Sequence, residues 1–225
     1  DAVSLQSDTC EGYAPAVPAA AERAAFLNEL RFVAWDLTYG RRPGRRVSAW
    51  LADNGLGAER LAWFAANGSD RGCIVGHDFY AGNEWLVDAD GGMRLRDDPA
   101  GYAAQARAYH DHFGLPFMLS ETNTDGPGAR AWLATMWDEC LTLRAAGLPI
   151  RGICWYGFVD HVDWDTALRE INDRPNHCWL VGLDRRPHPV GEAYRELARD
   201  ATLGIFAPLA DGGTVDHAHG GTGAA

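Results

Sequence analysis

Three stretches of the sequence each end an apolar run in polar and aromatic residues that could bind or cleave a sugar. Residues 114–128 read GLPFMLSETNTDGPG, in which the run PFML leads through one serine to the carboxylate of Glu121. The other two are CIVGHDFYAGNEW and PIRGICWYGFVDHVDWD, at 73–85 and 149–165. Carboxylates and amides bind hydroxyl groups, and aromatic rings pack on the apolar face of a pyranose. The combination favours a carbohydrate site.

Glu121 is the strongest candidate for a chemical role, because a carboxylate directly after a buried strand adds little to stability. It is either a catalytic nucleophile at the end of a barrel strand or a surface residue where a loop begins. The same loops hold candidate sugar ligands, each of which could instead be a solvated or locally hydrogen-bonded loop residue. They are His77, Asn83, Glu84, Asn123, Asp160 and His161.

The elements that would position these residues alternate along the chain. Strands are predicted at 2–8, 73–80 and 116–119 and in the run that begins at 149. Helices are predicted at 18–40, 47–55, 57–68, 98–114, 128–147 and 190–201, with Asp98 as the N-cap of the fourth, and an Asp-Gly-Gly turn favours a hairpin over 84–96. This order predicts an α/β fold with a parallel sheet and four βα units. The carboxyl ends of its strands would bring the three polar stretches together.

Composition excludes several classes of function. The chain has 225 residues, is 47% hydrophobic and carries a net charge of −11, so we expect a soluble globular protein that binds neither nucleic acid nor an anionic membrane. Its longest apolar runs, such as GICWYGFV, are far shorter than the roughly 20 residues of a membrane span. Five widely spaced cysteines favour reduced thiols in the cytoplasm. The Gly-rich segment 204–225 is predicted to be a disordered tail, and no metal or organic cofactor is expected.

Three segments resemble known glycosidases in the right order. PFMLSETN resembles the seventh strand of clan A retaining glycoside hydrolases, which delivers a glutamate in an ITENG or AETG context. GICWYGFVDHVDW is similar to the eighth-strand segment FVWSLLDNFEW of glycoside hydrolase family 1, and IVGHDFYAGNEW to its sixth-strand IGINYY segment. Over about residues 25–200 the chain resembles bacterial family 1-like glycosyl hydrolases of the β-glucosidase type. This resemblance implies a (β/α)8 TIM-barrel fold and hydrolysis of β-linked sugars.

The resemblance also implies roles for individual residues. Glu121 becomes the nucleophile that forms a glycosyl-enzyme intermediate, and Tyr80 the tyrosine that hydrogen-bonds it. Trp155 matches the aromatic platform under the bound sugar. Asp163 and Trp164 stand where the family has a Glu-Trp pair that contacts distal hydroxyls, but here the acid is one carbon shorter and lies one residue further from Trp155.

The second carboxyl group of a retaining glycosidase is missing from the matching positions. The resembled enzymes carry their acid/base in an NEP motif after strand four, and this chain has no NEP. Glu84, in NEW, falls in the sixth-strand loop and is assigned to substrate binding. A full barrel typically needs about 250 residues, so residues 1–203 are interpreted as the C-terminal half, strands five to eight. We expect this half to need an N-terminal half-barrel, on the same or a separate chain, and to be inactive and aggregation-prone alone.

Two alternatives remain open at this point. The chain could be a non-catalytic carbohydrate-binding or partner protein that kept the sugar contacts of a glycosidase barrel and lost its acid. It could also belong to a hydrolase of another clan A family, such as a mannosidase or an endoglucanase. The sequence does not distinguish gluco from manno substrates.

Overall fold

A four-stranded parallel sheet forms the centre of the molecule. The computed structural model describes residues 3–177 and 179–199, so the predicted tail lies outside the described residues. The strands are β1 Ser4–Thr9, β3 Cys73–Asp78, β6 Phe117–Glu121 and β7 Ile150–Ile153, in the order β1-β3-β6-β7. The predicted α/β fold with a parallel sheet is confirmed. The described residues do not close this sheet into a barrel.

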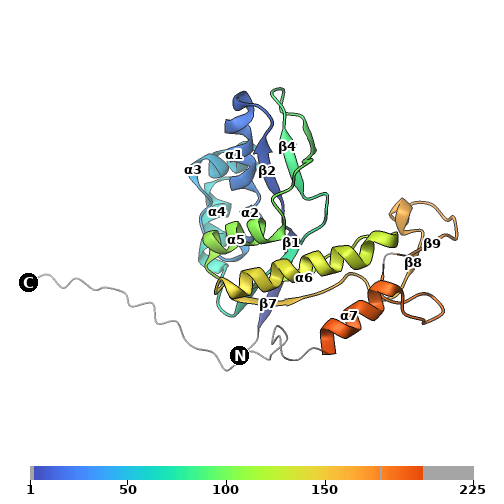
Figure 1. Ribbon diagram of the computed structural model, residues 1–225. Coiled ribbons are helices and arrows are strands. Elements are labelled where there is room, and N and C mark those ends of the chain that lie inside the picture. Colours follow the sequence, from blue (N-terminus) through green and yellow to red (C-terminus); the bar gives the residue numbers. More distant parts are fainter. Residues whose placement is uncertain (1–2, 178, 200–225) are drawn as a thin grey trace, which may run out of the picture.

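Helices cover one face of this sheet (Figure 1). The helices packed in the main core are α2 Val33–Thr38, α5 Tyr102–Phe113, α6 Ala129–Ala145 and α7 Pro189–Arg199. Apolar strand residues such as Val75, Phe117 and Leu119 point into this core and are almost fully buried. Two further helices, α3 Arg45–Asp53 and α4 Ala58–Asn67, lead from α2 to β3. We call the covered side of the sheet the outer face.

The other side of the sheet, here called the inner face, is far less covered. Side chains alternate along a strand, so Leu5, Ser7 and Asp78 lie opposite the buried outer-face residues. Leu5 is 47% exposed, Ser7 is exposed and Asp78 is only partly buried. Among the described residues, β1 and β7 each have a neighbouring strand on one side only. The sheet therefore has two edges and one open face.

A smaller three-stranded sheet stands beside the first. It contains β2 Gly12–Pro15, β4 Glu84–Val87 and β5 Met93–Leu95, with β4 and β5 antiparallel as the predicted hairpin requires. Helix α1 Ala21–Leu30 packs on it through a small core that includes Leu27 and Val87. Strand β2 was not predicted, because its four residues GYAP end in a proline and show no clear alternation.

The predicted helix over 18–40 is interrupted. It consists of a short 3-10 turn, Pro18–Ala20, then α1 and α2, with a break at residues 31–32. At the break the Arg31 guanidinium donates to the backbone oxygen of Glu11 and, at 2.9 Å, to Oε1 of Gln105. Phe32 is buried in the main core. Tertiary contacts at these two residues replace continued helix.

The prediction that Asp98 caps the helix over 98–114 is wrong. Helix α5 begins at Tyr102, and its N-cap is Gly101 with a φ of +88°. That backbone conformation favours glycine. The first helical amides are satisfied by side chains from elsewhere, which the local sequence does not reveal.

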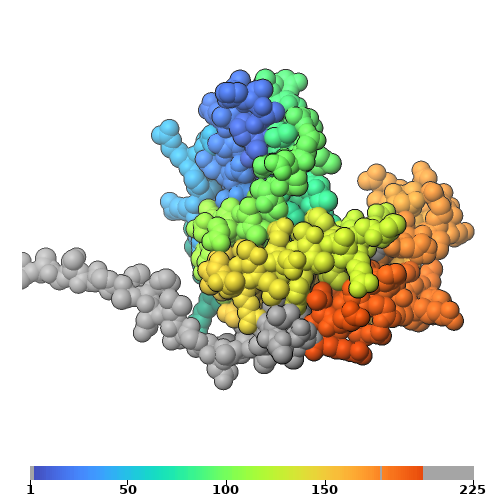
Figure 2. Space-filling model, viewed as in Figure 1, coloured from blue at the N-terminus to red at the C-terminus, as the bar shows by residue number. Residues whose placement is uncertain are grey.

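A long segment joins β7 to α7. Its described residues form two short strands, β8 His161–Val162 and β9 Pro175–Asn176, which pair antiparallel, and the 3-10 turn Trp164–Thr166. Figure 2 shows this orange region standing apart from the blue and green N-terminal part, with α6 running from one to the other. No helix in the described part of the chain is both long and apolar enough to cross a bilayer.

Candidate functional site

Glu121 and Tyr80 meet at the carboxyl ends of two neighbouring strands. Glu121 is the last residue of β6, and Tyr80 follows the end of β3 by two residues. The Tyr80 hydroxyl donates a hydrogen bond to Oε1 of Glu121. Burial, followed by this hydrogen bond, raises the pKa of Tyr80 well above its ordinary value. Tyr80 therefore stays protonated and keeps donating to the carboxylate.

A hydroxyl-carboxylate network lies next to this pair on the inner face. Ser7 donates to Oδ1 of Asp78, and Ser120 donates to the same oxygen at 3.1 Å. The Ser7 and Ser120 hydroxyl oxygens are 2.7 Å apart, although β3 lies between their strands. Gly76 makes this possible, because a Cβ there would come within 2.7 Å of Ser120 Oγ. The network fixes the strand that carries Glu121.

The tip of β6 is held from both sides. The Phe79 amide donates to the backbone oxygen of Glu121 at 2.9 Å, which ties it to the chain after β3. Thr122 is fully buried and accepts a 2.8 Å hydrogen bond from the Trp132 indole. Asn123 donates through Nδ2 to the Tyr156 carbonyl at 2.6 Å. Asn123, predicted to bind sugar, thus links the β6 tip to the loop after β7.

Trp155 lies in the main core, and its neighbour Tyr156 lies beside the site. Trp155 is 4% exposed and packs with core residues such as Ile153, so its ring is not an open platform. Tyr156 is half-buried and close enough to Tyr80 to contribute to raising its pKa. Its ring centroid lies 6.0 Å from that of Trp164. Trp155 and Tyr156 are neighbours in the chain, so their side chains lie on opposite sides of it. The ring beside the site is therefore that of Tyr156.

Cys154 lies close enough to Glu121 and Asp78 for their charges to act on its thiol. The residue as a whole is exposed, but its thiol is partly shielded from water, and this desolvation, followed by the charges of Glu121 and Asp78, raises the pKa of the thiol. The three side chains therefore come from the ends of β3, β6 and β7. The other described cysteines, Cys10, Cys73 and Cys140, are also free thiols.

His77 is placed in the core rather than with Glu121. Its side chain is fully buried on the outer face of β3, where Nδ1 lies 3.2 Å from the Tyr102 hydroxyl. Its ring stacks on Phe117, with centroids 5.3 Å apart. Burial, followed by the charge of Arg31, lowers the pKa of His77 to about 3. The imidazole is therefore a neutral core group, and the structure does not bring it to the predicted site.

Asn83 and Glu84 also have internal roles. Asn83 Oδ1 accepts from the Tyr80 amide at 2.6 Å, which shapes the turn after β3. Glu84 is 2% exposed, and its carboxylate accepts from the amides of Ala100 and Gly101 at 2.8 and 2.7 Å. These two amides lie just ahead of α5 and have no partner within the helix, so Glu84 satisfies them. Its negative charge also complements the helix dipole at this end. In the described structure Glu84 caps this helix.

The loop after β7 holds the remaining predicted ligands. Asp163 accepts hydrogen bonds from the amides of Asn172, Asp173 and Arg174 at 2.9, 3.2 and 3.0 Å. The Arg174 amide is the main cause of a lowered pKa at Asp163. The carboxylate thus closes the loop on itself, one residue before Trp164, which is 40% exposed.

His161 and Asp160 point to different surroundings. The His161 ring lies 4.5 Å from that of Trp179 and 5.5 Å from that of Trp164, within an aromatic group. Asp160 is buried and bonds to His177 and His188. His161 and Trp164 thus lie in the same aromatic group as Tyr156, and Asp160 forms a separate cluster.

The sequence therefore predicts the pair of Glu121 and Tyr80 but not all of the residues that surround and support it. Ser7, Asp78, Ser120 and Tyr156 were not singled out. The signal that could have found the first three is strand alternation, since Ser7 and Asp78 lie on the face opposite to the apolar residues. For Tyr156 no comparable signal exists, because Trp155 and Tyr156 are equally good candidates until the strand end is known.

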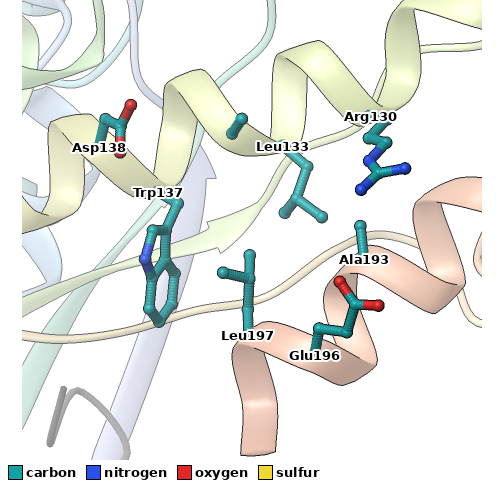
Figure 3. Close-up of a pocket in the computed structure, with 8 residues that line it drawn as sticks. Arg130, Leu133, Trp137, Asp138, Ala193, Glu196 and Leu197 are labelled. Carbon is teal, nitrogen blue, oxygen red and sulfur yellow. The ribbon is translucent and has the colours of Figure 1, made fainter. Parts of the chain in front are cut away.

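A shallow hollow on the helical side contains none of these residues. Figure 3 shows it between α6 and α7, where Leu133, Trp137 and Leu197 point into the gap and Arg130 and Glu196 lie at its side. Its lining is that of a helix-helix contact. We place the candidate site at the strand ends instead, because the carboxylates and the half-buried phenols gather there.

The fold of this chain is similar to that of solved β-glucosidase structures from Thermotoga maritima. A β-glucosidase from Thermotoga maritima in complex with a calystegine derivative matches with a TM-score of 0.69 and 13% identity, and the match covers 86% of this chain and 50% of that chain. The complex with glucoimidazole gives a TM-score of 0.67 and 12% identity, covering 86% and 50%. The complex with isofagomine lactam, described as a family 1 β-glucosidase, gives 0.66 and 13%, covering 86% and 50%.

These matches establish likeness of fold. The chain spans about half the length of the β-glucosidase chains that it matches. No family model matches the sequence, and no curated protein matches it either. The shared α/β architecture, with its parallel sheet and covering helices, is therefore glycosidase-like.

Proposed function

We propose that this chain is the nucleophile-bearing half of a retaining β-glycosidase barrel, of the β-glucosidase type. The observation that carries the proposal is the hydrogen bond from Tyr80 to Glu121 at the ends of adjacent parallel strands. In parallel α/β barrels the carboxyl ends of the strands carry the chemistry. A carboxylate that is held by a permanently protonated phenol stays oriented for attack.

In this proposal Glu121 attacks the anomeric carbon and forms a covalent glycosyl-enzyme through an oxocarbenium-like transition state. Tyr80 fixes the attacking carboxylate, and the network of Ser7, Asp78 and Ser120 supports the strand beneath it. The exposed ring of Trp164 and the half-buried ring of Tyr156 supply aromatic faces for a carbohydrate substrate.

The acid/base belongs to the other half of the barrel. A retaining glycosidase needs a second carboxyl group about 5–5.5 Å from its nucleophile. The two sheet edges and the open inner face fit an N-terminal half-barrel that would bring this group. The twofold greater length of the similar β-glucosidase chains supports this arrangement.

Covalent labelling of the intact protein tests the proposal. A 2-fluoro glucoside with a good leaving group should add one sugar to the peptide that contains Glu121, seen by mass spectrometry after proteolysis. Glu121→Gln should remove the label. Glu59→Gln, at an exposed glutamate of α4, is the matched control and should label like the wild type.

The outcomes separate the two functions kept open by the sequence. Label on another residue rejects Glu121 as the nucleophile. Protein that binds β-glucosides in calorimetry, yet hydrolyses none and takes no label, is the non-catalytic binding protein. If a mannoside is hydrolysed faster than the glucoside, Glu121 remains the proposed nucleophile and only the proposed substrate sugar changes.

A further inference from the structure

Asp160, His177 and His188 come together from three separate segments of the long region between β7 and α7. Asp160 precedes β8, His177 follows β9, and His188 directly precedes α7. Asp160 Oδ2 lies 2.6 Å from His177 Nδ1 and 2.9 Å from His188 Nε2. All three groups can direct a ligand atom to one point, since these atoms lie within 4.8 Å of one another.

The carboxylate of this cluster is buried, whereas its two imidazoles reach the surface. The Asp160 side chain is 0% exposed, whereas His177 and His188 are 65% and 27% exposed. Within residues 3–177 and 179–199, no arginine forms an ion pair with Asp160. A buried carboxylate is costly unless a positive charge compensates it. A cation bound between the carboxylate and the two imidazoles would supply that compensation.

We infer that Asp160, His177 and His188 bind a divalent transition-metal ion, with Zn²⁺ as the best fit. Two imidazole nitrogens and one carboxylate oxygen are typical zinc ligands, and three protein ligands leave a fourth position to water. Ligand atoms at Zn–N and Zn–O distances of about 2.0–2.2 Å in a tetrahedral site lie about 3.3 Å apart. The hydrogen-bonded contacts of 2.6 and 2.9 Å would open slightly on binding, and the exposed His177 side chain is free to move.

The position of the cluster suggests a structural ion. In the described residues of this region, the regular structure is limited to two-residue strands, isolated bridges such as that between Val159 and Val181, and one 3-10 turn. A metal bound at all three residues ties the chain after β7, the end of β9 and the start of α7 together. The site contains neither Glu121 nor Tyr80, so the inference stands apart from the proposed glycosidase function.

Metal binding is measured on the intact protein after dialysis against a chelator. Zn²⁺ is titrated at pH 7.5 against a chromophoric indicator, and Co²⁺ is added separately to record the visible absorption of tetrahedral coordination. We expect one equivalent of Zn²⁺ with micromolar or tighter affinity. His177→Asn should weaken binding by at least about 10-fold, and since His177 is exposed, the variant should fold.

The matched control is His112→Asn. His112 Nε2 lies 2.8 Å from Oδ1 of buried Asp36, so this pair resembles half of the cluster without a second imidazole. It should bind Zn²⁺ like the wild type. Zn²⁺ should also slow tryptic cleavage after the exposed Arg169 in the wild type but not in His177→Asn. The inference is overturned if no stoichiometric Zn²⁺ binds, or if His177→Asn and His188→Asn bind it as tightly as the wild type.

Discussion

Ser7 on β1 and Ser120 on β6 hold their hydroxyl oxygens 2.7 Å apart above Gly76, which belongs to the strand between them. A side chain at position 76 would occupy the space through which the two hydroxyls meet. One small residue therefore couples three strands, and on one of them, β6, the proposed nucleophile Glu121 directly follows Ser120.

Gly76→Ala should destabilise the protein by about 1–3 kcal/mol. The new Cβ would lie 2.7 Å from Ser120 Oγ and 2.9 Å from the Ser7 Cα, and the second contact can be relieved only by moving β1. The midpoint and slope of urea unfolding measure the effect. Gly128→Ala is the control, because Gly128 has helical dihedral angles and no atom near its virtual Cβ. Equal stability of both variants would refute the steric coupling.

Tyr80→Phe should lower kcat/KM of the intact enzyme by roughly 10–100-fold. The lost hydrogen bond to a charged group contributes about 1.5–3 kcal/mol, and each 1.36 kcal/mol is about tenfold in rate. Steady-state kinetics on an aryl β-glucoside provides the measurement. Tyr13→Phe removes the hydrogen bond of another Tyr-Glu pair, from Tyr13 to Glu11, and should leave the kinetics unchanged. A fully active Tyr80→Phe variant would argue against this role.

Glu84→Gln should reduce the free energy of unfolding by about 1–3 kcal/mol and leave turnover per folded molecule unchanged. The carboxamide would turn donors or a weaker acceptor toward the amides of Ala100 and Gly101, which the carboxylate now satisfies. Glu59→Gln on α4 controls for the loss of an exposed charge. A large rise in KM with unchanged stability would restore Glu84 to the substrate site.

His77→Gln should make stability less sensitive to acid. The pKa of His77 in the folded protein is about 3, below the ordinary 6.5, so the unfolded chain takes up a proton first as the pH falls. His77 therefore costs nothing above pH 6.5 and lowers the free energy of unfolding by up to about 1.4 kcal/mol per pH unit below it. Urea unfolding at pH 7, 5.5 and 4.5 should show a shallower loss in the variant. Parallel curves would contradict the neutral buried imidazole.

The sequence predicted the elements well because their patterns are local. The strand before Glu121 and the hairpin after Glu84 follow from apolar runs and turn residues within a few positions. What the sequence could not predict depends on distant contacts. The N-cap of α5 is Gly101 and not Asp98. The amides at this end of the helix, those of Gly101 and Ala103, donate to Glu84 and Glu139, which belong to other elements.

The same reason explains the errors at the candidate site. Glu121 and Tyr80 were predicted as a pair from the resemblance to family 1 glycoside hydrolases, and the structure joins them. His77 and Trp155 failed to reach that pair because each side chain lies on the buried side of its strand. A shift of one residue along a strand moves a side chain from one face of the sheet to the other. A motif that mixes polar and aromatic residues does not determine which of them lies on which face.

Because the side chains of β3 alternate between the core and the open inner face, substitutions at neighbouring positions should have different effects. The side chains of Val75 and His77 are buried in the core. Gly76 and Asp78 instead face the open inner side of the sheet. In a saturation mutagenesis screen that scores cellular abundance separately from sugar cleavage, substitutions at 75 and 77 should deplete abundance. Those at Asp78 should leave the protein abundant and impair cleavage. Neighbouring codons of one strand would thus fall into opposite phenotypic classes.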